Sequence, residues 1–354
     1  MKVAVYTIAK NEEQFVERWH QSAKDADYLL IADTGSTDKT VDIAVKLDIN
    51  VFDISISPWR FDDARNAALS LVPSDMDYCI ALDMDEILLP GWREELEKAH
   101  TQGWTRPRYK YTWSWKSEGV PGLQYGGDKI HARKGYRWRH PVHEVITADR
   151  IKEIQGWTEL EIHHHPDDTK SRGQYFPLLE LSVNEDPTDD RNAYYFAREL
   201  YFHGLYDKAI EEFKRHLSLP KAVWKPERAA SMRYIAKISE AWEDKEAWFK
   251  KAVEEVPDRR EAYVDLAKLY YEREMWAECL EVTEKALAIE EKPLEYLCED
   301  FAWGSAPWDY AAIAAYNLNQ FDKAINYGTK AVELNPEDQR LQTNLFFYKL
   351  KETE

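Results

Sequence analysis

The sequence predicts an α/β domain with a mostly parallel sheet, followed by an all-α solenoid of repeated helical units. Two observations carry this prediction. Short apolar runs alternate with helical patterns up to about Glu185, and from about Asp190 onward nearly all strand patterns give way to a recurring helical motif. A chain of 354 residues can form two cores of ordinary size. We place the two domains at 1–186 and 187–354.

The first domain opens with strands and helices in alternation, which is typical of a parallel sheet covered on both faces. Thr37, Asp38 and Asp42 suit the start of the second helix, because short polar side chains cap exposed N–H groups. The predicted strands are Lys2–Ala9, Tyr28–Asp33, Asn50–Ile56 and Asp77–Leu82, and the predicted helices are Glu12–Ala26, Thr37–Leu47 and Asp62–Leu71.

The second domain repeats small and large residues at fixed offsets. Small residues let paired helices approach closely, and large ones fill the next groove. The pattern resembles the tetratricopeptide repeat, in about four copies over Asp190–Pro336 with Asp338–Lys351 as a capping helix. The recurring positions are Ala197, Gly204, Tyr206, Ala209 and Phe213, then Ala267, Glu274, Trp276, Cys279 and Thr283, then Ala312, Asn319, Phe321, Ala324 and Gly328.

Composition removes several classes of protein. The net charge of −18, from 47 basic and 65 acidic residues, argues against broad contact with nucleic acid or an anionic membrane. Three distant cysteines argue against a disulfide framework. No apolar run is long enough for a transmembrane helix, and acidic residues come too early for a signal peptide. We expect a cytoplasmic protein.

The strongest chemical motif is Asp83-Met84-Asp85-Glu86, which follows the apolar end of the fourth predicted strand. Ligands of an open parallel sheet bind at the carboxyl ends of its strands, so both aspartates could reach into that crevice. Carboxylates suit Mg²⁺ or Mn²⁺, which usually bind a substrate diphosphate as well. The alternative is a solvated turn.

Three further segments carry polar residues near strand ends. Thr7–Glu12 follows the first strand, Ala32–Asp38 the second, and Phe61–Asn66 opens the third helix. Asp33 could accept hydrogen bonds from a nucleoside, with Gly35 allowing a tight turn, or it could be a turn residue. We expect Asp38 to be a cap. Arg65 could reach a nucleotide or lie exposed on its helix.

The segments TIAKNEE, IADTGSTDKT, DDARNAAL and DMDE, in this order and spacing, resemble a family 2 glycosyltransferase of the GT-A fold over roughly the first 150 residues. With the repeats, the chain is similar to bacterial lipopolysaccharide-core transferases and peptide S-glycosyltransferases. The resemblance implies an inverting transfer of a sugar from a nucleoside-diphosphate donor, with a UDP-sugar expected, and a divalent metal, Mn²⁺ or Mg²⁺. It implies nucleoside contacts from Thr7, Ala9, Glu12 and Asp33, with Asp83 and Asp85 near ribose, diphosphate and metal, and Asn11, Arg65, Met84 and Lys129 as further donor contacts.

Inversion requires a base that takes the proton of the acceptor. The family usually supplies it from a Glu-Asp pair after the Asp-x-Asp strand, which this sequence lacks there. Trp138–Glu144 instead resembles the Trp-x-x-x-Val-His-Glu stretch of the lipopolysaccharide-core branch. We expect Glu144 as the base and His143 as the second choice. The alternative for Glu144 is a salt bridge with an arginine of the basic segment described below.

Consecutive histidines lie near the end of the first domain. In a strand, His163 and His165 would share one face and His164 would point the other way. We expect His163 or His165, with His165 preferred, to complete the coordination of a metal held by Asp85. A histidine-rich loop is the alternative, and zinc is disfavoured because no cysteine lies near.

A basic segment rich in aromatic residues, Arg106–Arg139, should lie over the mouth of the site. Lys129, Arg133 and Arg137 could neutralise the leaving diphosphate. The alternative is a mobile, solvated loop.

Other function classes fit less well. A tetratricopeptide adaptor with an idle front domain predicts a decayed Asp-x-Asp motif, and an aspartate phosphohydrolase carries that motif on its first strand. A sugar-nucleotide pyrophosphorylase requires a glycine-rich first loop, which TIAKNEE lacks. The acceptor remains open among a saccharide, a lipid-linked glycan and a peptide. The repeats could bind the acceptor, another protein or a second subunit.

Overall fold

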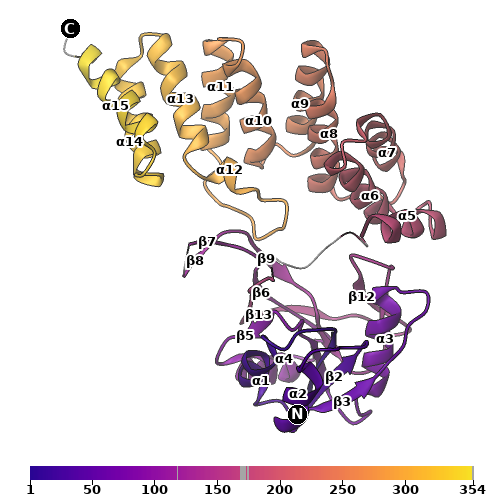
Figure 1. Ribbon diagram of the computed structural model, residues 1–354. Coiled ribbons are helices and arrows are strands. Elements are labelled where there is room, and N and C mark those ends of the chain that lie inside the picture. Colours follow the sequence, from indigo (N-terminus) through magenta and orange to yellow (C-terminus); the bar gives the residue numbers. More distant parts are fainter. Residues whose placement is uncertain (118, 168–172, 174, 353–354) are drawn as a thin grey trace. The chain divides into compact units, whose positions relative to one another are not determined.

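The computed structural model describes residues 1–117, 119–167, 173 and 175–352 (Figure 1). The chain divides into two compact units, Met1–Ser182 and Val183–Glu354. The first is a mixed α/β unit and the second is helical, which is the fold class that the sequence predicts. The predicted domain boundary after residue 186 stays a prediction.

The main sheet of the first unit has the strand order β10-β4-β1-β2-β3. Its four predicted strands run parallel, and β10 pairs antiparallel with β4 at one edge. The strands are β1 (Val3–Ala9), β2 (Tyr28–Asp33), β3 (Asn50–Asp53), β4 (Tyr78–Ala81) and β10 (Ile130–Ala132).

Both faces of this sheet are covered, because successive residues of a strand point to opposite sides. Val3 and Val5 of β1 pack with residues of α1, α2 and α4, whereas Ala4 and Tyr6 pack with α3 and the β11–β12 hairpin. The elements that cover the sheet are α1 (Val16–Ala23), α2 (Thr40–Lys46), α3 (Phe61–Leu71), α4 (Trp92–Thr101), β11 (Tyr136–Arg139) and β12 (Val145–Ala148).

The strand order reverses at β1. The chain builds β2 and β3 on one side of β1 and then crosses over to place β4 on the other side. A crevice opens outside the carboxyl ends of the strands at such a switch point, and ligands bind there in open α/β sheets. Thr7 and Asp83 follow the paired residues Tyr6 and Ala81 at this end.

A second sheet, in the order β5-β13-β6-β9, lies against α4 and the main core. His164 of β13 pairs with Glu86 of β5, so the histidine tract is brought beside the acidic motif. The strands of this sheet are β5 (Glu86–Leu88), β6 (Arg106–Thr112), β9 (Gln124–Gly127) and β13 (Gln155–His164). The basic segment is largely strand, and it also contains a separate pair, β7 (Trp115–Ser117) and β8 (Val120–Pro121).

The first two helices begin later than predicted, at Val16 and Thr40. Asn11 has a positive φ of 56°, and the amides of Glu12 and Glu13 donate to Thr40 Oγ1 and Asp38 Oδ2 at 2.7 and 3.0 Å. These hydrogen bonds to the neighbouring loop hold the segment outside the helix. Strand β3 likewise ends at Asp53 and not at Ile56.

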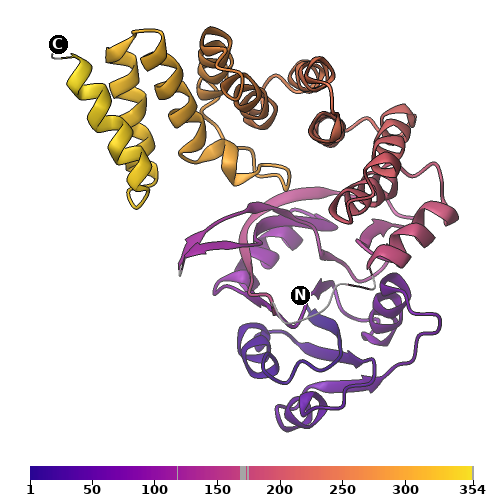
Figure 2. The ribbon, with the colours of Figure 1, turned by 45° about the horizontal axis from the view of Figure 1, so that its top comes forward.

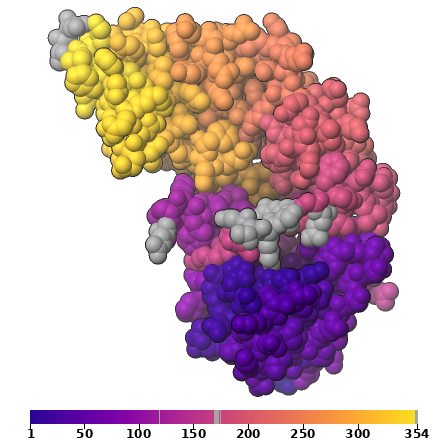
Figure 3. Space-filling model, in the orientation of Figure 1, coloured from indigo at the N-terminus to yellow at the C-terminus, as the bar shows by residue number. Residues whose placement is uncertain are grey.

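The second unit stacks four helix pairs in chain order (Figure 2), and in Figure 3 the surface of this unit passes through the colours in the same order, from pink to yellow. A short helix, α12, precedes the fourth pair. The helices are α5 (Tyr175–Glu185), which spans the division, α6 (Asp190–Phe202), α7 (Tyr206–Ser218), α8 (Lys225–Ile238), α9 (Trp242–Glu255), α10 (Arg260–Tyr271), α11 (Trp276–Leu287), α12 (Asp300–Trp303), α13 (Ala306–Asn317), α14 (Phe321–Leu334) and the capping helix α15 (Gln339–Glu352).

The recurring small residues lie where the helices meet. Ala209, Cys279 and Ala324, which share one offset of the repeat, are each fully buried. A side chain on Gly328 would come within 3.1 Å of Tyr348 of the capping helix. Among the described helices none is long and apolar enough to cross a membrane.

Candidate active site

Asp83 lies at the carboxyl end of β4 between two cations. Arg65 Nη2 donates to its Oδ1 at 2.8 Å, and Lys129 Nζ donates to its Oδ2 at 2.6 Å. Burial raises the pKa of Asp83, but the charges of Arg65 and Lys129 outweigh it and lower the pKa overall. Asp83 is therefore an anion that the protein has already neutralised.

Lys129 joins Asp83 to a second acid. Its Nζ also donates to Glu86 Oε1 at 2.8 Å, and the hydroxyl of Tyr111 donates to the same oxygen at 2.5 Å. Glu86 Oε2 accepts from the Asp83 amide at 2.9 Å. Burial lowers the pKa of Lys129, but Asp83 and Glu86 outweigh it and raise the pKa, so the ammonium stays charged.

Arg65 joins Asp83 to Glu144. It lies in the first turns of α3, only 6% exposed, and its Nε donates to Glu144 Oε1. Its guanidinium also stands over the ring of Trp138, 5.0 Å from the centroid. Glu144 thus forms a salt bridge, but its partner is Arg65 of α3 and not an arginine of the basic segment, as the alternative had it. No hydrogen bond joins Glu144 Oε2 to any residue that the structure describes.

His164 is the histidine whose ring meets Asp85. Its Nε2 lies 3.2 Å from Asp85 Oδ2, its Nδ1 lies 2.9 Å from the Trp113 carbonyl, and its ring stacks on Trp113. Burial lowers the pKa of His164, but the hydrogen bond and charge of Asp85 outweigh it and raise the pKa. Together, Asp85 and His164 offer an oxygen and a nitrogen donor.

This differs from the predicted choice of histidine. His163 points away from Asp85 and its Nε2 contacts Glu161 Oε1 at 2.8 Å, and the ring of His165 stacks on Trp115. Only the backbone amide of His165 reaches Asp85, donating to its carbonyl at 2.8 Å. The alternation within the strand is as predicted, but the face turned to the acidic motif is the opposite one.

The predicted nucleoside residues shape a loop. Both Asp33 oxygens are engaged, Oδ2 by the amides of Gly35 and Ser36 at 3.0 and 2.9 Å and Oδ1 by the Ser36 hydroxyl at 2.5 Å. Asn11 Oδ1 accepts from the Thr37 amide at 2.7 Å, and the Ala9 carbonyl accepts from the Thr34 amide at 2.9 Å. Thr7 is buried beside them, and Glu12 follows in the same segment. Their contacts with a nucleoside stay predictions.

Three other predicted residues have structural contacts. The side chain of Met84 lies in the hydrophobic core, so only its backbone could contact a sugar-nucleotide donor. Arg133 donates to the carbonyls of Val72 and Pro73 after α3, so it is engaged away from Asp83. His143 has a positive φ of 50°, and its ring lies edge-on to Tyr175 at 5.7 Å.

The site is rich in carboxylates. Four of them surround the two cations that form ion pairs with them, Arg65 and Lys129, while His164 and Arg18 lie near Asp85. The carboxylates are Asp83, Asp85, Glu86 and Glu144. The donor set therefore fits a divalent metal near Asp83, Asp85 and His164.

Sequence reasoning missed the roles of Glu86, Tyr111 and His164. Glu86 belongs to the recognised motif, but its link to Lys129 depends on β10 returning beside β4. The alternation of a strand predicts that His164 lies on the face opposite His163 and His165. Only the pairing of β13 with β5 decides which of these faces meets Asp85.

Two family models match parts of this chain. The model of glycosyl transferase family 2 matches residues 4–116, and that of the tetratricopeptide repeat matches residues 305–338. An uncharacterised glycosyltransferase of Rickettsia bellii (strain RML369-C) is 32% identical over 97 residues, which cover 27% of this chain and 32% of that relative. The match thus spans about a third of the relative's length.

The similar solved structures are tetratricopeptide proteins. YrrB, described as having an unusual peptide-binding site, has a TM-score of 0.40 at 13% identity, over 49% of this chain and 84% of its own. Yeast Tom70 has a TM-score of 0.38 at 19% identity, over 52% of this chain and 37% of its own. The two family models thus place a region similar to glycosyl transferase family 2 before a tetratricopeptide repeat in this chain.

Proposed function

We propose that this protein is an inverting, metal-dependent glycosyltransferase that moves a sugar from a UDP-sugar to an acceptor nucleophile. The observation that carries the proposal is the network around Asp83 at the carboxyl end of β4, where Arg65 and Lys129 flank the carboxylate at 2.8 and 2.6 Å. The network lies beside the switch point of the sheet, where a nucleotide would bind.

Lys129 and Arg65 would stabilise the departing diphosphate, because negative charge grows on it in the transition state. Both are held by carboxylates before a donor binds, so they need little reorganisation. Asp83, Asp85 and His164 would hold the divalent ion, which when bound supplies further positive charge to the diphosphate. A mixed carboxylate and imidazole set favours Mn²⁺ over Mg²⁺, which prefers oxygen ligands.

Glu144 is the proposed base, with His143 as the second choice. Arg65 fixes one oxygen of Glu144 and leaves Oε2 without a partner among the described residues, so this oxygen can accept the proton of an acceptor hydroxyl, amine or thiol. The acceptor is a saccharide, a lipid-linked glycan or a peptide, and the repeats would bind it, another protein or a second copy of the chain. We place the reaction in the cytoplasm.

The first experiment measures the melting temperature of the full chain with UDP, GDP and their sugars, with and without Mn²⁺. A nucleotide at a hundred times its Kd stabilises the folded state by about 2.7 kcal/mol. We expect stabilisation by UDP that depends on Mn²⁺. No shift with any nucleotide would contradict the proposal. A shift with GDP alone would mean that the donor is a GDP-sugar and not a UDP-sugar. Hydrolysis of a panel of UDP-sugars without acceptor then identifies the sugar.

The second experiment tests Glu144. Glu144→Gln removes the base and keeps the size of the side chain, so the transfer rate should fall by about 100-fold or more while the UDP shift is kept. Glu97→Gln, on the exposed face of α4, is the matched control. Wild-type transfer in Glu144→Gln would move the role to His143.

A further inference from the structure

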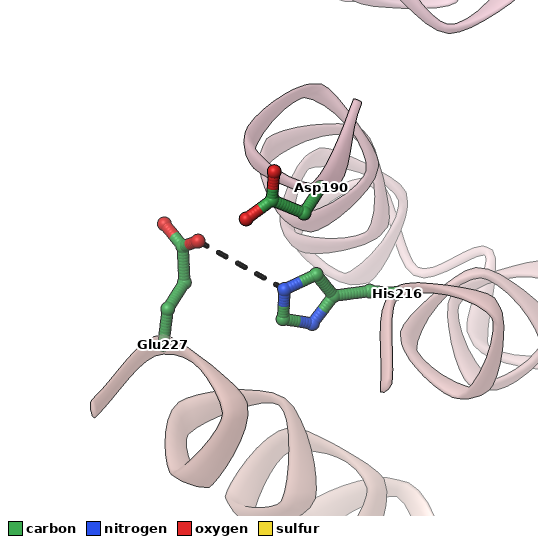
Figure 4. A group of neighbouring side chains, drawn as sticks. All are labelled: Asp190, His216 and Glu227. Atoms are coloured by element: carbon green, nitrogen blue, oxygen red, sulfur yellow. Dashed lines mark ion pairs between the residues drawn. The ribbon is translucent and has the colours of Figure 1, made fainter. Parts of the chain in front are cut away.

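Three potential metal ligands meet in the second unit, within the first two helix pairs. Asp190 is the first residue of α6, His216 lies in the last turn of α7, and Glu227 lies in the first turn of α8 (Figure 4). One ligand atom from each lies within 4.8 Å of the others. A dashed line in Figure 4 joins Glu227 to the imidazole ring, and the Asp190 carboxylate lies beside this pair.

His216 is the unusual member of this cluster. It is fully buried, and its Nε2 has no hydrogen-bond partner among the described residues. This nitrogen faces Glu227 Oε2 at 3.8 Å, which is too long for a hydrogen bond. A buried polar atom without a partner is costly, so a missing ligand is one physical explanation of its position.

The other ring nitrogen is already held. His216 Nδ1 lies 2.8 Å from Ser231 Oγ, and an Nδ1 proton donated to that hydroxyl would leave the lone pair on Nε2. Metal-bound histidines are oriented in this way by a hydrogen bond at the nitrogen that does not bind the metal. The ring is therefore directed at the two carboxylates.

Glu227 is held in the same manner. Only 3% of it is exposed, and the hydroxyl of Tyr296 donates to its Oε1 at 2.5 Å, which leaves Oε2 facing His216. Asp190 is half-buried, and no ion pair joins Asp190 or Glu227 to a lysine or arginine in the described part of the chain. Arg191 and Arg198 act on the charge of Glu227 from farther away, without an ion pair to it.

We propose that Asp190, His216 and Glu227 bind one divalent transition-metal ion, with zinc the best fit, at the junction of the first two helix pairs. One imidazole nitrogen and two carboxylate oxygens are ligands that zinc accepts, whereas Mg²⁺ and Ca²⁺ prefer oxygen alone. The two carboxylates would neutralise the ion. A water or another group would complete four-coordination.

The spacing allows this with small side-chain movements. Ligand atoms of a tetrahedral zinc site lie roughly 3.3 Å apart, because each is about 2.1 Å from the ion. His216 and Glu227 are near this separation at 3.8 Å, and Asp190, at the start of its helix, must move closer. The bound ion would tie α6, α7 and α8 together.

The nearby arginines have other contacts. Arg215 pairs with Glu212 and Arg228 pairs with Glu255, each at 2.8 Å. Arg191 stands over the ring of Tyr195, and Arg198 stands over the rings of Tyr194 and Tyr195. The competing explanation is a metal-free cluster in which a protonated Glu227 donates to His216 after a small rotation.

The test uses the full chain with Asp85→Ala, so that the front site cannot hold the ion. After chelation, the protein is incubated with Zn²⁺, desalted and analysed for bound metal, and Co²⁺ is added to a second sample for its visible absorption. We expect about one zinc per chain and a higher melting temperature with zinc. The visible absorption of bound Co²⁺ should be that of a four-coordinate ion.

Two variants assign the ion to this cluster. His216→Gln and Asp190→Asn should each weaken zinc binding at least tenfold and remove the thermal shift. Asp190 is half-buried, and asparagine has nearly the same shape as aspartate. Asp190→Asn should therefore fold and test the site even if His216→Gln does not fold. His203→Gln, at the exposed end of α6, is the matched control and should bind zinc normally. No bound zinc in the parent, or zinc retained in Asp190→Asn and His216→Gln, would overturn the proposal.

Discussion

The two units of this protein each gather half-buried and buried carboxylates, and they neutralise them differently. In the first unit, Asp83 lies between Arg65 and Lys129, whereas in the second unit Asp190 and Glu227 have no such partners among the described residues. Burial raises the pKa of both Asp83 and Glu227. At Asp83 the two cations lower it overall, while that of Glu227 rises to about 7.

This difference suggests that the two groups of carboxylates have different functions. A site that must stabilise a transient anion keeps its own cations in place, so that they are ready when charge develops. A site without internal cations can instead take one from solution. The following predictions test whether this contrast is real.

The largest effect is expected for Asp85→Ala in the first unit. Loss of this carboxylate should abolish turnover, by about 1000-fold or more, while the protein stays folded, because Asp85 is partly exposed and contacts His164 rather than the apolar core. Initial rates and circular dichroism measure both results. Asp42→Ala, exposed on α2, should have wild-type activity. Wild-type turnover in Asp85→Ala would remove Asp85 from the reaction.

Arg65→Ala should have the largest effect on stability. It removes the cation that Asp83 and Glu144 share while Asp83 keeps Lys129, and both acids are half-buried, so the cost should be about 3 kcal/mol, the lower end for a broken buried pair. Urea unfolding measures this change. Arg150→Ala removes a guanidinium whose side chain is 92% exposed and should change stability little. Equal stability of Arg65→Ala and the wild type would show that Arg65 is not needed to neutralise Asp83 and Glu144.

Asp190→Asn provides the opposite arm of the comparison. In chelated protein it should change stability by less than about 1 kcal/mol, or increase it, because this carboxylate has no cationic partner to lose in the described structure. The same urea experiment measures it. A loss comparable to that of Arg65→Ala would mean that the two clusters are neutralised alike.

The two neighbouring histidines of β13 give a smaller and more specific prediction. His164→Gln should weaken the Mn²⁺-dependent effect of UDP by tenfold or more, whereas His163→Gln should leave it unchanged, because only the His164 ring contacts Asp85. Titrations of Mn²⁺ at fixed UDP, followed by melting temperature, distinguish the two. The reverse order would restore the histidine predicted from the sequence.

The smallest effect is expected away from both clusters, at Asp38. Its carboxylate accepts from the amide and hydroxyl of Thr40, at 2.9 and 2.5 Å, so Asp38→Ala should cost about 1 kcal/mol. Burial raises the pKa of Asp38, but these hydrogen bonds outweigh it and lower the pKa below 3.8. The contribution is therefore present above that value and lost as the pH falls through the lower folded value. A cost that persists unchanged in strong acid would contradict this explanation.

The sequence alone was enough for the class of each unit. Short apolar runs and helical patterns located β1, β2, β4 and α3 nearly to the residue, because burial against two layers leaves a strong apolar signal. The repeat offsets located Ala209, Cys279 and Ala324 at helix contacts for the same reason. The acidic motif was visible because it directly follows a buried strand.

Tertiary structure decided what those residues contact. Pairing of Arg65 with Glu144, of Lys129 with Glu86, and of His164 with Asp85 joins segments between 43 and 79 residues apart. The cluster of Asp190, His216 and Glu227 depends on the packing of three helices, and no local pattern marks it. Local patterns report which side of an element is buried, whereas partners across the chain depend on register and packing, which the free energy of the whole fold determines.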